Sequence, residues 1–377
     1  MGSAPATRED RHHRIGIEHH PSKEAVNEES ADRKTDRSTE FIRASNLWQR
    51  LEDRLTCHDR SMHERVLIVG AGIAGLAAAD ALRRSGVASV LVDKSRAVGG
   101  RMATRTIGGA RFDHGAQHFG IRSEAFAAVT RTWREAGKMH EWYQTANFEA
   151  RYVGSGGMRR IPEHLAASLD VRTGMAIARL DLDGEGPVAV GTGGERVEAA
   201  AFIITPPMPQ TLALLTAGRI DVPSSLGDAL LAIEYDPCLA VMLHLDGPSG
   251  LPDGHRSAVD ASIAWMADNA HKGTSTVPAV TLHSTPGFAA EHLDEDPEGW
   301  TNRLVAAAQP HLRGRITAAV GHRWRFAEPT TILDQGCSVL DTRVPVVLAG
   351  EVFAGAKIEG AVLSGLAAAS SIVERLA

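Results

Sequence analysis

The chain has 377 residues, of which 43% are hydrophobic, and its formal net charge is −6. This hydrophobic fraction suffices for the cores of two domains. The net negative charge provides no positive potential that would attract nucleic acid. The three cysteines, Cys57, Cys238 and Cys337, are widely scattered, so neither a disulfide framework nor a zinc site is predicted. No apolar run reaches a membrane-spanning length and no secretory signal is visible, so we expect a cytoplasmic protein without membrane contacts.

Residues 1–61 form a charged extension whose composition differs from the rest. They hold eleven Lys or Arg and twelve Asp or Glu, with almost no apolar residue before Phe41. Such a segment cannot bury enough apolar surface to order itself, so we expect disorder. Apolar residues at helical spacing within 41–55 indicate a possible short amphipathic helix, which either rests on the body of the protein or binds a partner.

A strand, a glycine-rich turn and a helix are predicted over residues 66–86. The apolar run 66–69 is typical of a buried parallel strand, and GAGIAG then fits G-x-G-x-x-G. The first glycine permits the tight turn, the second lets backbone approach a pyrophosphate, and the third lets helix and strand pack closely. The next strand, 90–92, ends in an acid at the distance expected for adenosine ribose hydroxyls. This stretch predicts a dinucleotide site formed by Gly70, Gly72, Ile73, Ala74, Gly75, Asp93 and Lys94.

Two further segments favour FAD over NAD as the dinucleotide. At Gly99-Gly100-Arg101 the chain is expected to turn back over the pyrophosphate, whose charge the arginine can neutralise. Near the C-terminus, a buried strand at 346–349 is followed by a Gly-Glu pair and a small-residue helix. The N-terminus of that helix is expected beside the flavin edge on which negative charge develops during reduction. The additional FAD contacts predicted are Gly100, Arg101, Gln117, His118, Ile177, Gly350, Glu351, Ile358 and Glu359.

The intervening chain is expected to supply a substrate domain. Helices are predicted at 123–137 and 297–311, and 202–205 is predicted to be a strand that returns to the FAD-binding sheet. Strands of a second, antiparallel sheet are predicted at 240–245, 262–266 and 280–283. The fold class is therefore α/β: a Rossmann-like FAD-binding domain of the glutathione-reductase type with an α+β substrate domain on a mixed or antiparallel sheet.

Both domains are predicted to be discontinuous, with the flavin ring between them. The FAD-binding domain comprises residues 62–122, 155–210 and 335–377. The substrate domain comprises residues 123–154 and 211–334.

From Val66 to its end, the chain resembles the bacterial renalase-like FAD-dependent oxidoreductases, which are relatives of the flavin amine oxidases. The matching segments are GAGIAGL, DKSRAVGGRM, FDHGAQHF, RYVGSGGM, FIITPPMPQTLALL, LHST, HRWRFAEP and GEVF…KIEGAVLSG. The first two and the last are common to the wider FAD superfamily, and the others are more particular. The resemblance implies oxidation of 2- and 6-dihydro isomers of NAD(P)H to NAD(P)+, with hydride transfer to flavin N5 and reoxidation by dioxygen to hydrogen peroxide.

The candidate catalytic residues are His283 and His118. The resemblance places Gln117, His118 and Phe119 over the flavin ring, where they also bind substrate. His283 lies on a predicted strand facing the flavin, where it either hydrogen-bonds substrate and handles a proton or is a structural histidine of the core. Trp265 is either a wall of the substrate pocket or a core tryptophan. The histidines, His114 among them, show no convergent ligand set, so no metal site is expected.

Three departures from the resemblance bear on substrate identity. The segment 142–151 is shorter than in relatives, His118 stands where tyrosine is common, and Val352-Phe353 stands where an aspartate-tryptophan pair is frequent. The alternatives are a flavin amine oxidase, a desaturase-like oxidoreductase of a small organic substrate, or a flavin-bound scaffold. An aromatic cage for an amine has little support from the C-terminal segment, because Phe353 is the only aromatic residue in 350–365.

Overall fold

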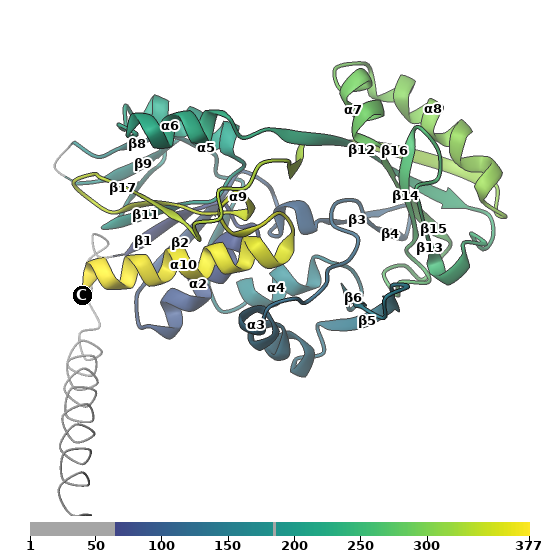
Figure 1. The fold of residues 1–377 in the computed structure, drawn as a ribbon, viewed down its shortest axis with the longest axis horizontal. Helices are drawn as coiled ribbons and strands as arrows, with labels where there is room; N and C mark the ends of the chain where they lie inside the picture. The colour runs from purple at the N-terminus through teal and green to yellow at the C-terminus, as the bar shows by residue number, and fades with distance from the viewer. Residues whose placement is uncertain (1–64, 184–185) are drawn as a thin grey trace, which may run out of the picture. The chain divides into compact units, whose positions relative to one another are not determined.

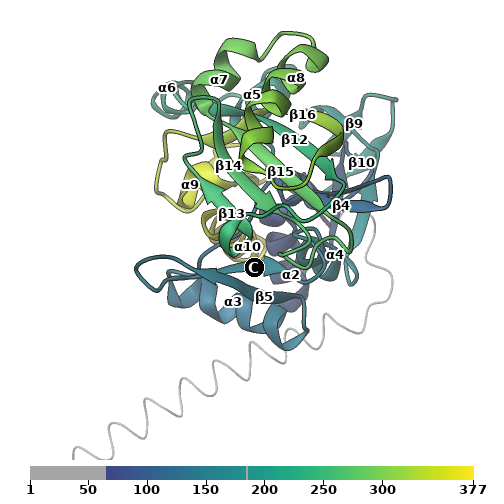
Figure 2. The ribbon, with the colours of Figure 1, turned by 90° about the vertical axis from the view of Figure 1, so that its right-hand side faces the viewer.

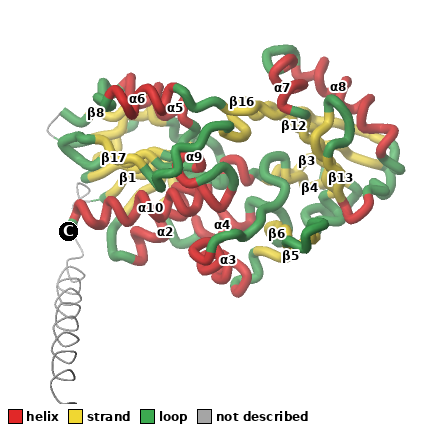
Figure 3. Tube along the Cα trace, in the orientation of Figure 1, coloured by secondary structure: helices red, strands yellow, loops and turns green. Residues whose placement is uncertain are grey.

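The computed structural model describes residues 65–183 and 186–377, so the charged extension 1–61 and its possible helix at 41–55 lie outside the described residues. Within the described ranges, a six-stranded sheet has the order β17-β18-β11-β1-β2-β7 (Figures 1 and 3). The strand β17 runs antiparallel to β18, and the other pairs are parallel. The strands are β1 (Val66–Val69), β2 (Ser89–Asp93), β7 (Asp170–Thr173), β11 (Ala201–Ile204), β17 (Ser338–Leu340) and β18 (Val346–Leu348). Leu67 pairs with Phe202, which confirms the predicted return of this segment to the sheet.

The six-stranded sheet is covered on both faces, as its continuous apolar strands require. In β1, Val66 and Ile68 pack under α2 (Ile73–Arg84) and α10 (Ile358–Leu376). Leu67 and Val69 point to the opposite core, because successive side chains of a strand alternate between faces. That core is closed by a three-stranded sheet and two helices, namely β8 (Ile177–Asp181), β9 (Val188–Gly191), β10 (Arg196–Glu198), α5 (Met208–Ala217) and α6 (Ser224–Leu231).

A second, antiparallel sheet has the order β13-β14-β15-β12-β16 in the described part of the chain (Figure 2). Its strands are β12 (Tyr235–Leu245), β13 (His255–Ser257), β14 (Ile263–Asp268), β15 (Ala279–Ser284) and β16 (Ile316–Pro329). This confirms the predicted strands at 240–245, 262–266 and 280–283. One face packs on α7 (Pro286–His292) and α8 (Pro297–Ala308) through residues such as Val241. The other face packs through Met242 on a hairpin of β3 (Thr104–Ile107) and β4 (Ala110–Asp113).

The remaining elements connect the two sheets. They are α3 (Glu124–Glu135), β5 (Met139–Gln144), β6 (Ala150–Gly154), α4 (Arg160–Ala166) and α9 (Glu351–Ala354). Helix α3 begins where Ser123 caps it by accepting a hydrogen bond from the Phe126 amide at 3.2 Å. The predicted helix at 297–311 is divided, because α8 ends at Ala308 and a 3₁₀ turn follows at Gln309–His311. No helix in the described part of the chain is both long and apolar enough to cross a membrane.

Candidate active site

The turn between β1 and α2 leaves open space in front of the helix. Gly72 precedes the first turn, and a Cβ built on it would meet no atom of the described residues within 4 Å. No side chain in the described part of the chain caps α2, and the first turn of this helix, which contains Ile73 and Ala74, carries no acidic residue. The amide groups of this turn therefore lack a side-chain acceptor, and an anion in the open space can accept their hydrogen bonds.

The two other glycines of the motif are required by the protein itself. Gly70 has a φ of +103°, and a Cβ on it would lie 2.4 Å from Oγ1 of Thr205. A Cβ on Gly75 would lie 2.0 Å from the carbonyl oxygen of Gly70. Both contacts are too close for any side chain, so these glycines shape the turn while Gly72 faces the space for the ligand.

The carboxylate of Asp93 is fixed at the end of β2. Its oxygens accept hydrogen bonds from the amides of Ala71 and Ser95, each at 2.7 Å. The amide of Met175 donates to the Asp93 main-chain carbonyl at 2.9 Å, which places the residues just before β8 beside the end of β2. Ile177 is the first residue of β8. The side chain of Lys94 instead donates to Gln210 at 2.8 Å on the surface.

The second glycine turn lies directly against the first. Gly99 bridges to Gly72 and donates to the carbonyl of Ala71 at 2.9 Å, and a Cβ on Gly100 would lie 3.5 Å from Cα of Gly72. The next residue, Arg101, places Nη1 2.6 Å from Oε1 of buried Glu351.

The N-terminus of α10 is held beside that of α2. A Cβ on Gly365 would lie 2.2 Å from the carbonyl oxygen of Ala74, so the two helices touch through backbone. Lys357 precedes α10 with a φ of +102°, a strained conformation for a residue with a side chain. Ile358 opens the helix, and the Glu359 carboxylate accepts from the amides of residues 122 and 123 at 3.0 and 2.8 Å, which ties α10 to the start of α3.

A row of side chains crosses the second sheet on the face that carries the β3–β4 hairpin. Trp265 pairs with His283, His283 with Ala240, and Ala240 with His322. Directly opposed residues of antiparallel strands share a face, so the tryptophan and both histidines line one surface.

Gln117, another predicted substrate residue, contacts His283 of this row. The amide nitrogen of Gln117 donates to the carbonyls of Asp113 and Gly115 at 2.6 and 2.9 Å and lies 3.3 Å from Nε2 of His283. Because both amide hydrogens are thereby used, His283 Nε2 carries the proton and donates to the His114 carbonyl at 3.2 Å. Nδ1 of His283 is left as an acceptor in the neutral ring.

A buried lysine supports Gln117 from behind. Nζ of Lys272 donates to Oε1 of Gln117 at 3.2 Å and lies 3.0 Å from Oδ2 of Asp113. Asn269 and Thr274 complete the network by hydrogen-bonding to the Asp113 amide and carboxylate at 3.1 and 3.0 Å. The sequence analysis did not select Lys272, and the one available signal was a lysine within the uncharged loop after Asn269.

His118 belongs to a cluster of aromatic rings. Its ring centroid lies 5.3 Å from that of Trp265 and 5.6 Å from that of Tyr143. Trp142 and His255 extend the cluster, and His255 stacks on Tyr143 at 4.0 Å. We call these five residues the aromatic cluster. Sequence reasoning missed Trp142, Tyr143 and His255, although the first two lie in the segment noted as shorter than in relatives.

Phe119, also predicted to bind substrate, is separated from that cluster. It is 4% exposed, and its ring packs 6.0 and 6.1 Å from those of Phe126 and Trp133 in the core under α3.

Several buried polar atoms at this surface lack a hydrogen-bond partner in the described residues. They are Nδ1 of His118, Nδ1 of His114 and Nε1 of Trp265. Unpaired polar atoms are rare in protein interiors and call for a bound partner. Together with the open, uncapped turn at Gly72, they fit a heteroaromatic, phosphate-bearing cofactor such as the predicted FAD.

His118 and His283 are neutral at physiological pH. Burial, reinforced by the charges of Lys272 and Arg151, lowers the pKa of His118 to about 3. Burial lowers the pKa of His283 to about 4, with the His114 hydrogen bond opposing and Lys272 adding to the effect. Neither ring is therefore available as a charged acid near neutrality.

Comparisons with known proteins agree with the fold and with FAD as the cofactor. A model of the NAD(P)-binding Rossmann-like domain matches residues 68–136, and a model of flavin-containing amine oxidoreductases matches residues 121–373. Similar solved structures include a triple mutant of putrescine oxidase, with 16% identity, a TM-score of 0.62 and coverage of 83% of this chain and 99% of that chain. A candidate protoporphyrinogen oxidase from Exiguobacterium sp. has 13% identity and a TM-score of 0.67 over 83% of this chain and 99% of its own. The chain therefore belongs to the flavin-containing amine oxidoreductase family, and it is an FAD-dependent oxidoreductase.

Proposed function

We propose that the protein is an oxidase of dihydronicotinamide dinucleotides of the renalase type, which converts the 2- and 6-dihydro isomers of NAD(P)H to NAD(P)+. Bound FAD would supply the redox chemistry: a hydride taken from the substrate, together with one proton from solvent, would reduce dioxygen to hydrogen peroxide. The protein's part is to bind the dinucleotide, orient its ring and exclude water.

The observation that carries this proposal is the positive charge around the substrate candidates. Lys272, Arg151 and Lys357 all act electrostatically on His118, but each is paired with a carboxylate, namely Asp113, Glu149 and Glu328. The excess of positive charge lies in a pocket of about 640 Å³, which we call the α3 pocket and which adjoins this region because Arg151 lines it. Its basic side chains are Arg122, Arg131, Arg134 and Arg151, against the single acid Glu149. Such a field attracts a phosphate-bearing substrate and opposes a protonated amine.

The residues of the site have distinct tasks in this reaction. Trp265 and His118 offer ring faces and edges on which a nicotinamide ring can pack. Nδ1 of His283, the free acceptor, can orient the carboxamide of the ring. Gln117 is held by three hydrogen-bonded neighbours, so its position changes little when substrate binds. The transfer of a hydride from a dihydropyridine requires no acid or base, which agrees with the neutral histidines.

A flavin amine oxidase is the second candidate. The aromatic cluster favours it, because faces of Trp and Tyr attract cations. The amine oxidoreductase family and the putrescine oxidase fold support it as much as the first candidate. Against it, Nζ of Lys272, which is paired with Asp113, already lies 5.3 Å from the Trp142 ring, so one face of the cluster is taken by a resident ammonium group.

Anaerobic mixing of the FAD-loaded enzyme with each substrate class separates the two candidates. We expect 2- or 6-dihydro-NAD(P) to bleach the flavin absorbance at least 100-fold faster than ordinary 4-dihydro NADH or primary amines, because a displacement of about 1 Å costs on the order of 100-fold in rate. Rapid bleaching by an amine, with none by the dihydronicotinamides, would establish the amine oxidase instead.

A further inference from the structure

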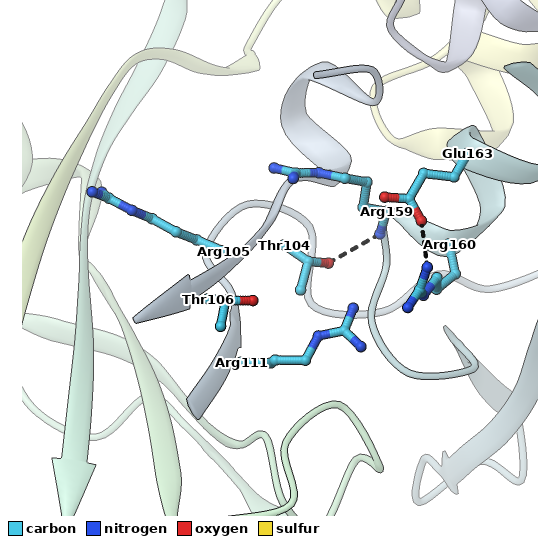
Figure 4. Close-up of a pocket in the computed structure, with 7 residues that line it drawn as sticks. All are labelled: Thr104, Arg105, Thr106, Arg111, Arg159, Arg160 and Glu163. Atoms are coloured by element: carbon cyan, nitrogen blue, oxygen red, sulfur yellow. Dashed lines mark hydrogen bonds and ion pairs between the residues drawn. The ribbon is translucent and has the colours of Figure 1, made fainter. Parts of the chain in front are cut away.

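A second basic pocket lies on the other side of the β3–β4 hairpin from the second sheet. Its volume is about 400 Å³, and it is lined by the hairpin and by the start of α4 (Figure 4). We call it the hairpin pocket. Arg111 comes from the hairpin, and Arg159 and Arg160 come from the start of α4. Arg105 lies at the rim, and its side chain extends away from these three, on the face of the hairpin that it shares with Phe112. Glu163 is the hairpin pocket's only acidic lining residue in the described chain.

The charge of the hairpin pocket is largely uncompensated. Arg160 pairs with Glu163 at 2.9 Å, which accounts for the one carboxylate. Within residues 65–183 and 186–377, the guanidinium groups of Arg111 and Arg159 have no hydrogen-bond or ion-pair partner. Nε of Arg159 is in addition buried without an acceptor. Burying a guanidinium beside like charges costs free energy unless an anion compensates it.

We propose that the hairpin pocket binds a phosphate or diphosphate group. Guanidinium forks from two separate elements surround the space, and several arginines with planar donor pairs suit the many oxygens of a diphosphate better than a single carboxylate. The volume falls within the range of about 300–1,000 Å³ that is usual for small-molecule sites, so a nucleotide can carry the phosphate.

The hairpin pocket is joined to the active-site network by a short chain of hydrogen bonds. The Arg159 amide donates to Oγ1 of Thr104 at 3.1 Å, and that hydroxyl donates to Oδ1 of Asp113 at 2.6 Å. The other oxygen of Asp113 holds Lys272. Thr106 and Arg111 oppose one another on the hairpin, as do Thr104 and Asp113, so all four share one face. The phosphate can therefore belong either to the dinucleotide substrate or to a separate phosphorylated ligand.

Calorimetric titration of the full-length, FAD-loaded protein with inorganic pyrophosphate at low salt tests the site. We expect one site, weakened at least tenfold by Arg111→Gln or Arg159→Gln and also by added salt. Arg160→Gln changes an exposed lining residue and keeps the test available should Arg159→Gln fail to fold. Arg196→Gln, at an exposed position on β10, should stay within twofold of wild type.

Pyrophosphate that does not bind, or that binds to the Arg111, Arg159 and Arg160 variants as tightly as to wild type, overturns the proposal. A loss of binding confined to Arg131→Gln also overturns it, because the anion then occupies the α3 pocket. Competition between NAD+ and pyrophosphate, lost in Arg111→Gln, assigns the phosphates to the dinucleotide. Independent binding of the two assigns them to a separate ligand. None of these measurements requires turnover, so their outcome is independent of the proposed oxidase activity.

Discussion

The ammonium of Lys272 lies 3.0 Å from Oδ2 of Asp113, and neither side chain is exposed to solvent. Asp113 ends β4 immediately before the segment that carries His114 and Gln117, and its Oδ1 also accepts from the Met158 amide at 2.9 Å. The ion pair therefore joins the loop after β14, the hairpin and the approach to α4 at one buried point. Its role is to hold the side chain of Gln117 in place and, through Gln117, to fix the environment of the His283 ring.

Removal of one partner of this ion pair should destabilise the fold strongly. Lys272→Met leaves a buried carboxylate without its cation, which costs about 3–5 kcal/mol. Lys272→Met combined with Asp113→Asn removes both charges and should recover a large part of that loss. Chemical denaturation of the FAD-free proteins measures both. An equal free energy of unfolding for Lys272→Met and wild type would show that the ion pair does not stabilise the fold.

The glycines of the first turn should separate cofactor binding from folding. Gly72→Ala places a methyl group in open space, so the FAD-free protein should keep its unfolding free energy within about 1 kcal/mol while FAD affinity falls at least tenfold. Gly75→Ala drives a methyl group into the Gly70 carbonyl and should abolish the native fold. Circular dichroism and flavin fluorescence titration distinguish the two effects. Undiminished FAD binding by Gly72→Ala would mean that the cofactor lies elsewhere.

The stability of the protein should fall on mild acidification. Burial, with the charge of His322 adding, lowers the pKa of His114 to about 3, and the pKa of His283 is lowered to about 4, whereas both titrate near 6.5 when unfolded. Between pH 6.5 and 4 the unfolded chain therefore binds more protons, and each histidine reduces stability by up to about 1.4 kcal/mol per pH unit as pH falls. His114→Asn should flatten this slope in denaturation curves measured across that range. A slope unchanged in the variant would assign the acid sensitivity to other groups.

His283 should matter more for flavin reduction than for FAD binding. With His283→Ala, the acceptor at Nδ1 and the hydrogen bond to the His114 carbonyl are both lost. We expect at least a tenfold slower anaerobic reduction of the flavin and an FAD dissociation constant within threefold of wild type. His140→Ala, an exposed histidine on β5, serves as the control and should leave both values unchanged. A His283→Ala protein that loses FAD and keeps its reduction rate would reassign this residue to cofactor binding.

The sequence by itself determined the features that depend on local chemistry. The spacing of Gly70, Gly72 and Gly75 predicted the dinucleotide turn, because the steric needs of a tight turn and a close helix act within a few residues. Short apolar runs predicted the strands at 240–245, 262–266 and 280–283. These patterns sufficed for the fold class. The FAD cofactor was predicted from the Gly-Gly-Arg and C-terminal segments, and the class of enzyme from the resemblance to renalase-like oxidoreductases.

Only the tertiary structure decided which distant side chains meet. Lys272 and Asp113 are separated by 158 intervening residues and pair because β14, β15 and the hairpin stack against one another. The same packing directs Phe119 into the core while its neighbour His118 joins the aromatic cluster. Arg111, Arg159 and Arg160 likewise gather around one pocket, although nothing in the spacing between Arg111 and the later pair predicts it. The conformational preferences of its own residues determine whether a segment forms a helix or a strand. Contacts between distant segments depend instead on the strand register and on how the sheets pack, and the sequence pattern of one segment does not contain this information.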